Sequence, residues 1–418
     1  MKLSIQNLAR IHKADITIDG ITVVAGYNST GKSTISKALV CCMKPYGSMQ
    51  NMIKNQRIFN IMRALEDIGM HALPNTLYLN RNNDALRQLA KKIIEDSSVK
   101  LDTQVLISPF IESLSPDEQE SMANYIQENI DKIREDLKKK KEVTDQEYAV
   151  FIVNQQFRET FDQQINTLGC SEPALIDFID KETIHIKVVN NRVSECPVLT
   201  LNQPAPFYIE PVHMLDQSSM HLLFRKNRSI YQALLPDEAP SIKSMTMDEY
   251  SQREHALQIV TDLANTVMHG RLRPSDDTVL FYDDDFKENI SVKNLASGIK
   301  SMALIARLLE NGKLKPKGLL IIDEPEVNLH PEWQLSFASF LVQLNKELGI
   351  QILLTTHSPY FLRALEVYSR EFDVFDSLKL YLTTPCKEEG LSHLFTVEDM
   401  THDSNSIFKQ LYLPLEKL

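Results

Sequence analysis

The chain has 418 residues, more than one typical core needs, which suggests a large α/β domain with an insertion or two to three folding units. Its 43% hydrophobic and 24% charged residues are typical of a globular protein and exclude a disordered chain. The formal net charge of −11 argues against a general polyanion-binding surface, because phosphate neutralisation needs clustered Lys and Arg. Local contact with DNA or RNA stays possible but is not indicated by charge.

The N-terminus has no apolar segment before a small-residue cleavage site, and no stretch approaches the roughly 20 apolar residues of a membrane span. We therefore predict a cytoplasmic protein without membrane contact. The five cysteines show no paired metal-binding spacing, and cytosolic usage predicts that they are reduced and buried. They are Cys41, Cys42, Cys170, Cys196 and Cys386.

The first predicted elements are strands followed by a helix. Alternating apolar residues over 3–18 indicate strands, and residues 21–25, I-T-V-V-A, form a buried-strand run. Gly26 ends that strand, and a helical pattern runs from Lys32 without a breaker until Pro45. A glycine-bearing loop therefore connects a strand to a helix.

That loop, G-Y-N-S-T-G-K-S, fits the phosphate-binding pattern G-x-x-x-x-G-K-[ST]. Its glycines let backbone amides approach phosphate oxygens, and the helix N-terminus adds a favourable dipole. We expect Lys32 to contact the β- and γ-phosphates, Ser33 to ligate Mg²⁺, and Thr34 to make a weaker phosphate contact. The predicted ATP-binding residues of the loop are Gly26, Asn28, Ser29, Thr30, Gly31, Lys32, Ser33 and Thr34.

Residues 46–199 are polar and rich in Gln and Lys, and we predict that they form an inserted, mainly helical arm or lid region. Helical patterns cover about 84–97, 116–142 and 145–167. Heptads do not persist, so the arm should be short. The run Lys138–Lys141 could touch nucleic acid, but its acidic neighbours favour a solvated helix face.

The remaining residues, 1–45 and 200–418, should form a split core with helical lid segments at about 215–270. Strand patterns appear at 184–189 and 206–210, and a hairpin is predicted from 278–282 and 290–292. A helix begins near Ser297; a buried strand at 318–323, a helix at 332–347 and a strand at 350–356 follow. Strands alternating with helices predict an α/β fold with a mostly parallel sheet.

Two carboxylates follow the strongest buried strand, in L-L-I-I-D-E-P. The strand delivers Asp323 and Glu324 to its C-terminal end, where ligands of parallel sheets gather. We expect Asp323 to hold Mg²⁺, directly or through water, and Glu324 to polarise the attacking water. The alternative, an acidic pair that only caps a strand, is disfavoured by the phosphate loop.

At this point the sequence resembles the ABC-type ATPase superfamily, and more narrowly the RecF/SMC-like and overcoming-lysogenization-defect-like group of DNA repair and antiphage systems. The matching pieces, in family order, are the phosphate loop, N-L-A-S-G-I-K-S at 294–301, D-E-P-E-V-N-L-H-P at 323–331 and T-T-H-S-P at 355–359. They cover the first 45 residues and roughly 275–365. The resemblance implies a P-loop NTPase head with a mostly parallel core and an inserted helical arm.

The resemblance assigns a nucleotide-binding role to Ser297 and Gly298, which match the ABC signature that reaches the γ-phosphate held by the opposite protomer. This chain has L-A-S-G-I-K in place of L-S-G-G-Q, so the second glycine is absent. The alternative from the residues alone is that Ser297 is an ordinary N-cap of a helix beginning at Ile299.

His357 looks like the family's catalytic switch histidine, which contacts the γ-phosphate and the attacking water. Glu326, Asn328 and His330 look like the dimer-contact loop, and Pro331 suits the first position of the next helix. A metal site made by His330 and Glu326 is a weaker alternative, because spacing suggests no third ligand.

Several polar residues stay unassigned. The family's lid glutamine could be Gln155, Gln156, Gln163 or Gln164, and the sequence does not choose among them. His213, His221, His255 and His269 match neither a zinc site nor a nuclease motif, so we expect ordinary surface or core histidines.

Together these features predict an ATPase in which ATP is clamped within a homo-oligomer, at least a head-to-head dimer. The chain ends about 60 residues after His357, too few for a Toprim nuclease domain, so the resemblance implies an antiphage sensor or scaffold with a separate effector, a nuclease or toxin. The alternatives are a RecF/SMC-like DNA-repair ATPase and an ATP-dependent scaffold with little turnover.

Overall fold

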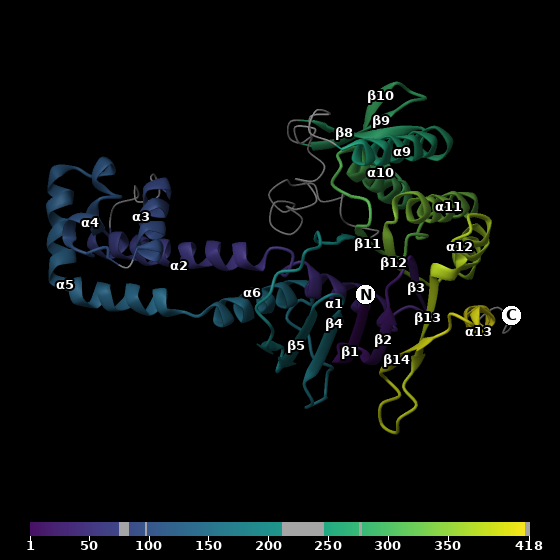
Figure 1. Cartoon of the computed structure of the whole chain (residues 1–418), viewed down its shortest axis with the longest axis horizontal. Helices are drawn as coiled ribbons and strands as arrows, with labels where there is room; N and C mark the ends of the chain where they lie inside the picture. Colours follow the sequence, from purple (N-terminus) through teal and green to yellow (C-terminus); the bar gives the residue numbers. More distant parts are fainter. Residues whose placement is uncertain (75–82, 97, 211–245, 276–277, 414–418) are drawn as a thin grey trace. The chain divides into compact units, whose positions relative to one another are not determined.

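The computed structural model describes the chain except residues 75–82, 97, 211–245, 276–277 and 414–418 (Figure 1). Its contacts separate two compact units. The head comprises Met1–Gly47, Phe157–Glu195 and Leu201–Leu418, and the arm comprises Ser48–Gln156 and Cys196–Thr200. The predicted helical segment at 215–245, with His213 and His221, lies outside the described residues.

The head is built on an eleven-stranded sheet in the order β6-β5-β4-β1-β2-β14-β13-β3-β12-β11-β7. Its strands are β1 (Lys2–Leu8), β2 (Ile11–Thr17), β3 (Ile21–Ala25), β4 (Ala174–Ile179), β5 (Thr183–Val189), β6 (Arg192–Glu195), β7 (Phe207–Ile209), β11 (Leu319–Asp323), β12 (Gln351–Thr356), β13 (Leu378–Pro385) and β14 (Phe395–Asp399).

The centre of this sheet is parallel. From β13 through β3, β12 and β11 to β7, every pair of neighbours runs in the same direction, as β14 and β2 also do. The strands β6, β5, β4, β1 and β2 extend it as an antiparallel meander. The predicted α/β fold with a parallel core is confirmed, and the loops after β3, β11 and β12 meet at one edge, where parallel sheets bind ligands.

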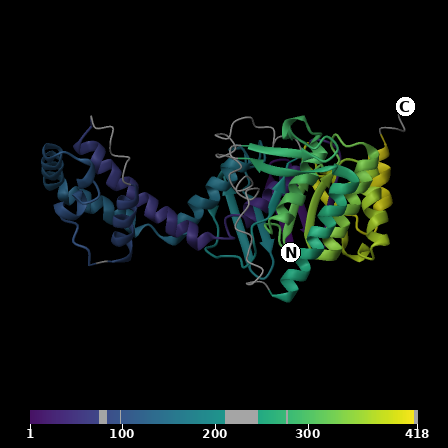
Figure 2. The ribbon, with the colours of Figure 1, turned by 90° about the horizontal axis from the view of Figure 1, so that it is seen from above.

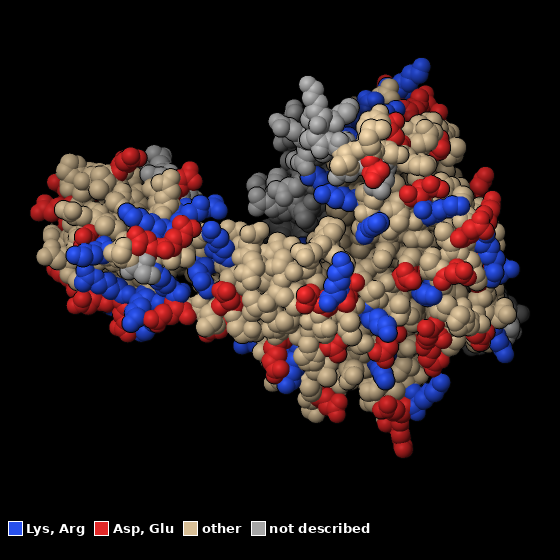
Figure 3. Space-filling view, in the orientation of Figure 1, with Lys and Arg blue, Asp and Glu red and all other residues tan. Residues whose placement is uncertain are grey.

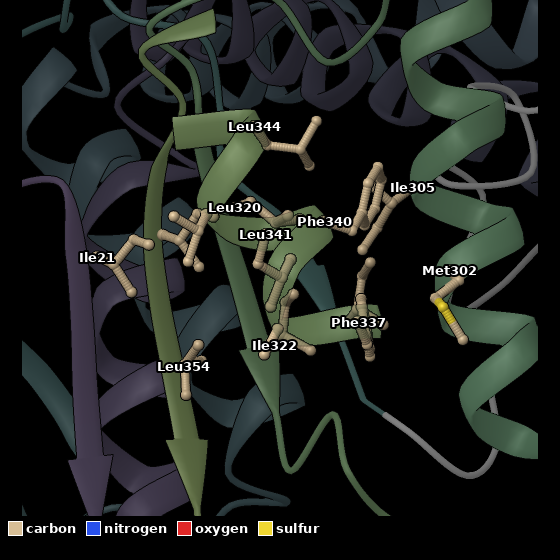
Figure 4. Packing of buried hydrophobic residues seen from close by; sticks show 14 of the residues in the cluster. Ile21, Met302, Ile305, Leu320, Ile322, Phe337, Phe340, Leu341, Leu344 and Leu354 are labelled. Atoms are coloured by element: carbon tan, nitrogen blue, oxygen red, sulfur yellow. The ribbon is translucent and has the colours of Figure 1, made fainter. Parts of the chain in front are cut away.

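Helices pack on both faces of the parallel core. Helix α1 (Lys32–Met43) contacts β11 and β12, and α11 (Pro331–Leu348) lies on the opposite face. Figure 4 shows Leu341 of α11 against Leu320 and Ile322 of the sheet, whereas Phe340 reaches Ile305 of α10 (Ser297–Glu310). Burying each such side chain contributes roughly 1.5–3 kcal/mol, so this layer fixes the strand edge that carries the site.

A small antiparallel sheet packs on α10 through β8 (Figure 2). Its strands are β8 (Gly270–Ser275), β9 (Thr278–Asp283) and β10 (Glu288–Ser291), so the predicted hairpin is confirmed. The other described helices of the head are α9 (Met247–Leu263), α12 (Pro359–Glu371) and α13 (Ser404–Tyr412). His255 and His269 are exposed, as expected.

The arm is helical. Its helices are α2 (Met49–Ala72), α3 (Asn83–Glu95), α4 (Thr103–Ile107), α5 (Pro116–Glu142) and most of α6 (Asp145–Thr160). They enclose their own apolar core, which includes Ile61, Leu65 and Ile126. Helix α5 begins as its sequence predicts, because Ser115 and Glu118 form a capping box ahead of Pro116.

Lys138, Lys139 and Lys140 lie on a solvated side of α5, as predicted, whereas Lys141 is half-buried and donates to the Ile93 carbonyl oxygen at 2.8 Å. Lys138, Lys139 and Lys140 pair with acidic residues one turn away, at 3.8, 2.7 and 3.8 Å. Positive and negative side chains also alternate over the face of the molecule in Figure 3. No helix among the described residues combines the length and apolar composition needed to cross a membrane.

Two sequence-based details differ from the structure. The segment 46–199, which was assigned to the arm, contains β4, β5 and β6. These strands belong to the head, because β4 pairs with β1 and its apolar side chains are buried in the head. Cys170 is only half-buried, whereas Cys41, Cys42, Cys196 and Cys386 are buried; none of the five is in a disulfide bond.

Candidate functional site

The loop between β3 and α1 has the backbone that phosphate binding requires. Gly31 has φ +90°, a conformation that side chains rarely allow. At Gly26 a Cβ atom would lie 1.9 Å from the Thr383 hydroxyl oxygen, so only glycine fits. Gly31 also precedes α1 without a side-chain cap, which leaves the first amide groups of α1 to bind an anion.

Lys32 lies inside this loop and is 4% exposed. Its Nζ donates to the carbonyl oxygens of Gly26 at 3.0 Å and Tyr27 at 2.8 Å. It also lies 3.4 Å from Oε1 of Glu324. Burial lowers the pKa of Lys32, and the neighbouring carboxylates oppose that shift. An anionic phosphate would meet a cation that is already partly desolvated.

Asp323 is the last residue of β11 and faces α1. Strand alternation places it on the face of Ile321, and its partner in register is Thr355 of β12. Ser36 donates to Asp323 Oδ1 at 2.7 Å, and Thr355 donates to the same oxygen at 3.1 Å. The Tyr208 hydroxyl donates to Oδ2 at 2.7 Å.

Burial and these hydrogen bonds act in opposite directions on the pKa of Asp323. Burial raises its pKa, whereas hydrogen bonds from Ser36, Tyr208, Thr355 and Ser33 lower it. The contact with Ser33 brings together the two residues predicted to bind Mg²⁺. A hydroxyl and a carboxylate are oxygen ligands of the kind that Mg²⁺ prefers.

Glu324 follows in a left-handed conformation, with φ +46°, which is uncommon for a residue other than glycine. Its amide donates to the Thr355 carbonyl oxygen at 3.0 Å, which holds the turn. Its Oε1 lies 3.5 Å from His357 Nδ1. His357 and then Lys32 lower the pKa of Glu324 against the effect of burial, so the carboxylate stays ionised and able to accept a proton.

Glu326 holds the backbone of His357 in place. The His357 amide donates to Glu326 Oε1 at 3.0 Å, and Thr356 donates its hydroxyl to the same oxygen at 2.5 Å. Glu324 raises the pKa of His357 against the effect of burial. Burial raises the pKa of Glu326, which is 4% exposed.

This position of Glu326, buried against Thr356 and His357, corrects the dimer-contact assignment for Glu326 only, and Asn328 and His330 stay predicted dimer-contact residues. It also removes the alternative of a metal site with His330. Nδ1 of His330 instead accepts a hydrogen bond from the Glu332 amide at 3.4 Å and caps α11, with Pro331 first in that helix as predicted.

These groups open onto a cleft of about 640 Å³. It is lined by Asn28, Glu324, Glu326, Val327, Asn328, Leu329, Gln334, His357, Ser358 and Pro359. The predicted base, the switch histidine and one residue of the phosphate loop thus face one space, although they come from distant parts of the sequence.

The signature segment forms the start of helix α10. Ser297 is the first residue of α10 and Ala296 is its N-cap, which corrects the alternative of a Ser297 cap for a helix beginning at Ile299. Gly298 packs tightly on Leu329, since a Cβ atom at Gly298 would lie 2.2 Å from Leu329 carbon atoms. Leu329 in turn lines the cleft, so the start of α10 contacts a residue of the cleft wall.

Sequence reasoning missed four residues that support the site. Ser36 lies one helical turn after Ser33, a spacing that could have identified it. Tyr208 and Thr355 flank β11 in neighbouring strands, and Thr383 hydrogen-bonds Thr30 at 2.7 Å. Only the strand order could reveal these last three.

A family model described as "AAA domain, putative AbiEii toxin, Type IV TA system" matches residues 73–363, well over half of the chain. The match includes the signature, the acidic pair and His357. The match begins after the phosphate loop, so the assignment of that loop rests on its own residues and geometry.

Two curated proteins share shorter stretches. Septu protein PtuA from Bacillus mycoides (strain KBAB4) is 32% identical over 108 residues, 24% of this chain and 15% of that protein. Retron Ec83 probable ATPase from Escherichia coli is 30% identical over 149 residues, which are 32% of this chain and 27% of that protein. The chain therefore matches less than a third of the length of these relatives.

Among solved structures, the SMC head domain from Thermotoga maritima aligns with 95% of this chain and 97% of its own length. The identity is 10% and the TM-score is 0.37.

Proposed function

The chain belongs to this family of AAA domains, and we propose that it binds ATP with Mg²⁺ and hydrolyses the γ-phosphate. Its resemblance to ABC-type ATPases of the RecF/SMC-like and antiphage-defence group is confirmed by the family and by the curated relatives. The family implies nucleotide binding and usually Mg²⁺; turnover by this chain is the proposal.

One observation carries it: Lys32 Nζ and His357 Nδ1 lie 3.4 and 3.5 Å from the same atom, Glu324 Oε1. We assign Lys32 to the β- and γ-phosphates, ionised Glu324 to the attacking water and His357 to the γ-phosphate. Ser33 and Asp323 are assigned to Mg²⁺. The remaining loop residues cradle the phosphates through their amide groups.

We assign the second half of the site to another copy of the chain. The support is the resemblance to the ABC signature, which in that family reaches the γ-phosphate held by the opposite protomer. A head-to-head dimer would bring Ser297 and Gly298 of the partner to the γ-phosphate. ATP would then bind the closed dimer better than the open one, which is the differential affinity that a ligand-driven switch needs.

The physiological proposal is a sensor or scaffold ATPase of a bacterial antiphage defence system that controls a separate nuclease or toxin. The similarity to Septu protein PtuA and to Retron Ec83 probable ATPase supports it. The proposal predicts that the native locus reduces phage plating and that Lys32→Ala in this chain removes the protection. Protection that survives Lys32→Ala would contradict it.

Phosphate release tests the enzymatic proposal. Purified chain should release inorganic phosphate from ATP only with Mg²⁺ and without DNA. A rate that depends on added DNA and falls steeply with salt would instead favour the RecF/SMC-like repair ATPase. Tight ATP binding without turnover would favour the scaffold.

A further inference from the structure

A second group of reactive side chains lies in the head, and none of its members lines the ATP cleft. His12 comes from β2, whereas Cys386 and Glu388 follow β13. One ligand atom from each residue lies within 4.8 Å of the other two. The strand order explains this meeting, because β14 begins with Phe395 opposite Ile11, and the chain between β13 and β14 therefore passes beside His12.

The tautomer of His12 is fixed by its neighbours. Asn7 is buried, and its Nδ2 donates to Glu172 Oε2 at 3.1 Å, which turns its Oδ1 toward the ring. Oδ1 lies 3.2 Å from His12 Nδ1. A carbonyl oxygen only accepts hydrogen bonds, so Nδ1 carries a proton. In the neutral ring, Nε2 then presents its lone pair.

That lone pair faces a carboxylate. His12 Nε2 lies 3.3 Å from Glu388 Oε1, and two acceptor atoms this close repel each other unless a proton or a metal ion lies between or beside them. A proton on the ring would satisfy the pair, and so would a metal ion. The buried thiol of Cys386 beside them favours the metal, because an ion pair at the surface needs no sulfur ligand.

We propose that His12, Cys386 and Glu388 bind a zinc-class divalent transition metal ion. A set of one sulfur, one nitrogen and one oxygen suits Zn²⁺, whereas Mg²⁺ and Ca²⁺ prefer oxygen alone. Asn7 acts as the outer partner that metal-bound histidines usually have. Cys386 binds as the thiolate, so binding releases its proton to solvent.

The site would fasten the loop after β13 to a strand that touches the phosphate loop. Arg10 lies two residues before His12. Its guanidinium donates to the Ser29 carbonyl oxygen at 2.9 Å, and its carbonyl oxygen accepts from the Phe395 amide at 2.9 Å. The side chain of Ile11 packs beneath Gly31. A bound ion would therefore stiffen the residues that support the phosphate loop. The ion itself would lie apart from the proposed catalytic groups.

The test titrates the full-length, nucleotide-free chain with Zn²⁺ against a chromogenic chelator and with Co²⁺ by absorption. We expect one ion per chain and a thiolate-to-cobalt charge-transfer band. Cys386→Ser should remove the band, and His12→Gln should weaken Zn²⁺ binding by about a hundredfold or more. Zn²⁺ should raise the melting temperature of the wild type but not of Cys386→Ser.

Matched variants make the test specific. His393→Gln changes an exposed histidine of the same loop, Cys170→Ser changes another free thiol, and Asp323→Asn changes the proposed Mg²⁺ site; all should retain the ion and the band. The Asn7→Asp variant keeps the hydrogen-bond acceptor for His12 and should bind Zn²⁺ more tightly than the Asn7→Ala variant. No stoichiometric binding, or binding that Cys386→Ser and His12→Gln leave intact, would overturn the proposal.

Discussion

Lys32 Nζ lies 3.4 Å from Glu324 Oε1, so the cation of the phosphate loop contacts the carboxylate proposed to activate water. The two residues lie far apart in the sequence and meet because β3 and β11 both flank β12 in a parallel sheet. This contact links the proposed binding and hydrolysis functions, and substitutions separate them.

Lys32→Ala should weaken ATP binding. Hydrogen bonds to charged groups contribute about 1.5–3 kcal/mol, so the dissociation constant should rise about tenfold or more. Isothermal titration with a non-hydrolysable ATP analogue measures it. Lys37→Ala, on the same helix but paired with Glu210 at 3.4 Å, is the control and should bind normally. Unchanged affinity in Lys32→Ala would refute the loop assignment.

Glu324→Gln should preserve ATP binding and slow turnover. Removing a general base typically costs a hundredfold or more in rate, and the closed dimer should persist longer. Single-turnover phosphate release and size-exclusion chromatography with ATP measure these effects. Glu332→Gln, an exposed change in the first turn of α11, should behave as the wild type. Normal turnover in Glu324→Gln would exclude this carboxylate as the base.

Glu324→Gln should also lower the pKa of His357. Glu324 is the main cause that raises this pKa above its ordinary value of 6.5. The raised pKa stabilises the folded chain below about pH 6.5, and this contribution is lost as pH rises through the folded value. A histidine NMR titration, assigned with His357→Gln, measures the shift. An equal pKa in both proteins would contradict the proposed coupling.

Tyr208→Phe should weaken Mg²⁺ binding. The Tyr208 hydroxyl lowers the pKa of Asp323, so its loss leaves a less anionic ligand. A lost hydrogen bond of about 1 kcal/mol predicts roughly a fivefold rise in the Mg²⁺ concentration for half-maximal turnover. Excess Mg²⁺ should restore the rate, and exposed Tyr360→Phe should have no effect. A lower rate that Mg²⁺ does not restore would exclude this positioning role.

Local patterns predicted the elements that carry the site. The run 318–323 and the helix from Lys32 correspond to β11 and α1, because an apolar strand bounded by special residues and an uninterrupted helical pattern are strong local signals. Helix α2 was not predicted, since its apolar residues show only weak helical periodicity.

Contacts between distant segments were not predictable. Nothing near Tyr208 indicates that its strand joins β11, and Glu326 points inward because it bonds Thr356 at the end of β12 and His357 directly after it. His12 and Cys386 likewise lack any shared spacing. Strand order, which a single sequence does not encode locally, brings each of these pairs together.

The central proposal is a composite site shared by two copies of the chain, and a mixing experiment tests it. Ser297→Arg should block the signature while its own phosphate loop still binds ATP, and Glu324→Gln should block hydrolysis while its signature stays intact. Each variant alone should be nearly inactive.

The decisive measurement is the ATP turnover of an equimolar mixture of Ser297→Arg and Glu324→Gln chains. In a mixed dimer, the phosphate loop of the first variant meets the signature of the second, so one site is complete. We predict recovery to about a quarter of the wild-type rate when two-fold dimers mix statistically. Turnover no higher than that of the separate variants would contradict the shared site.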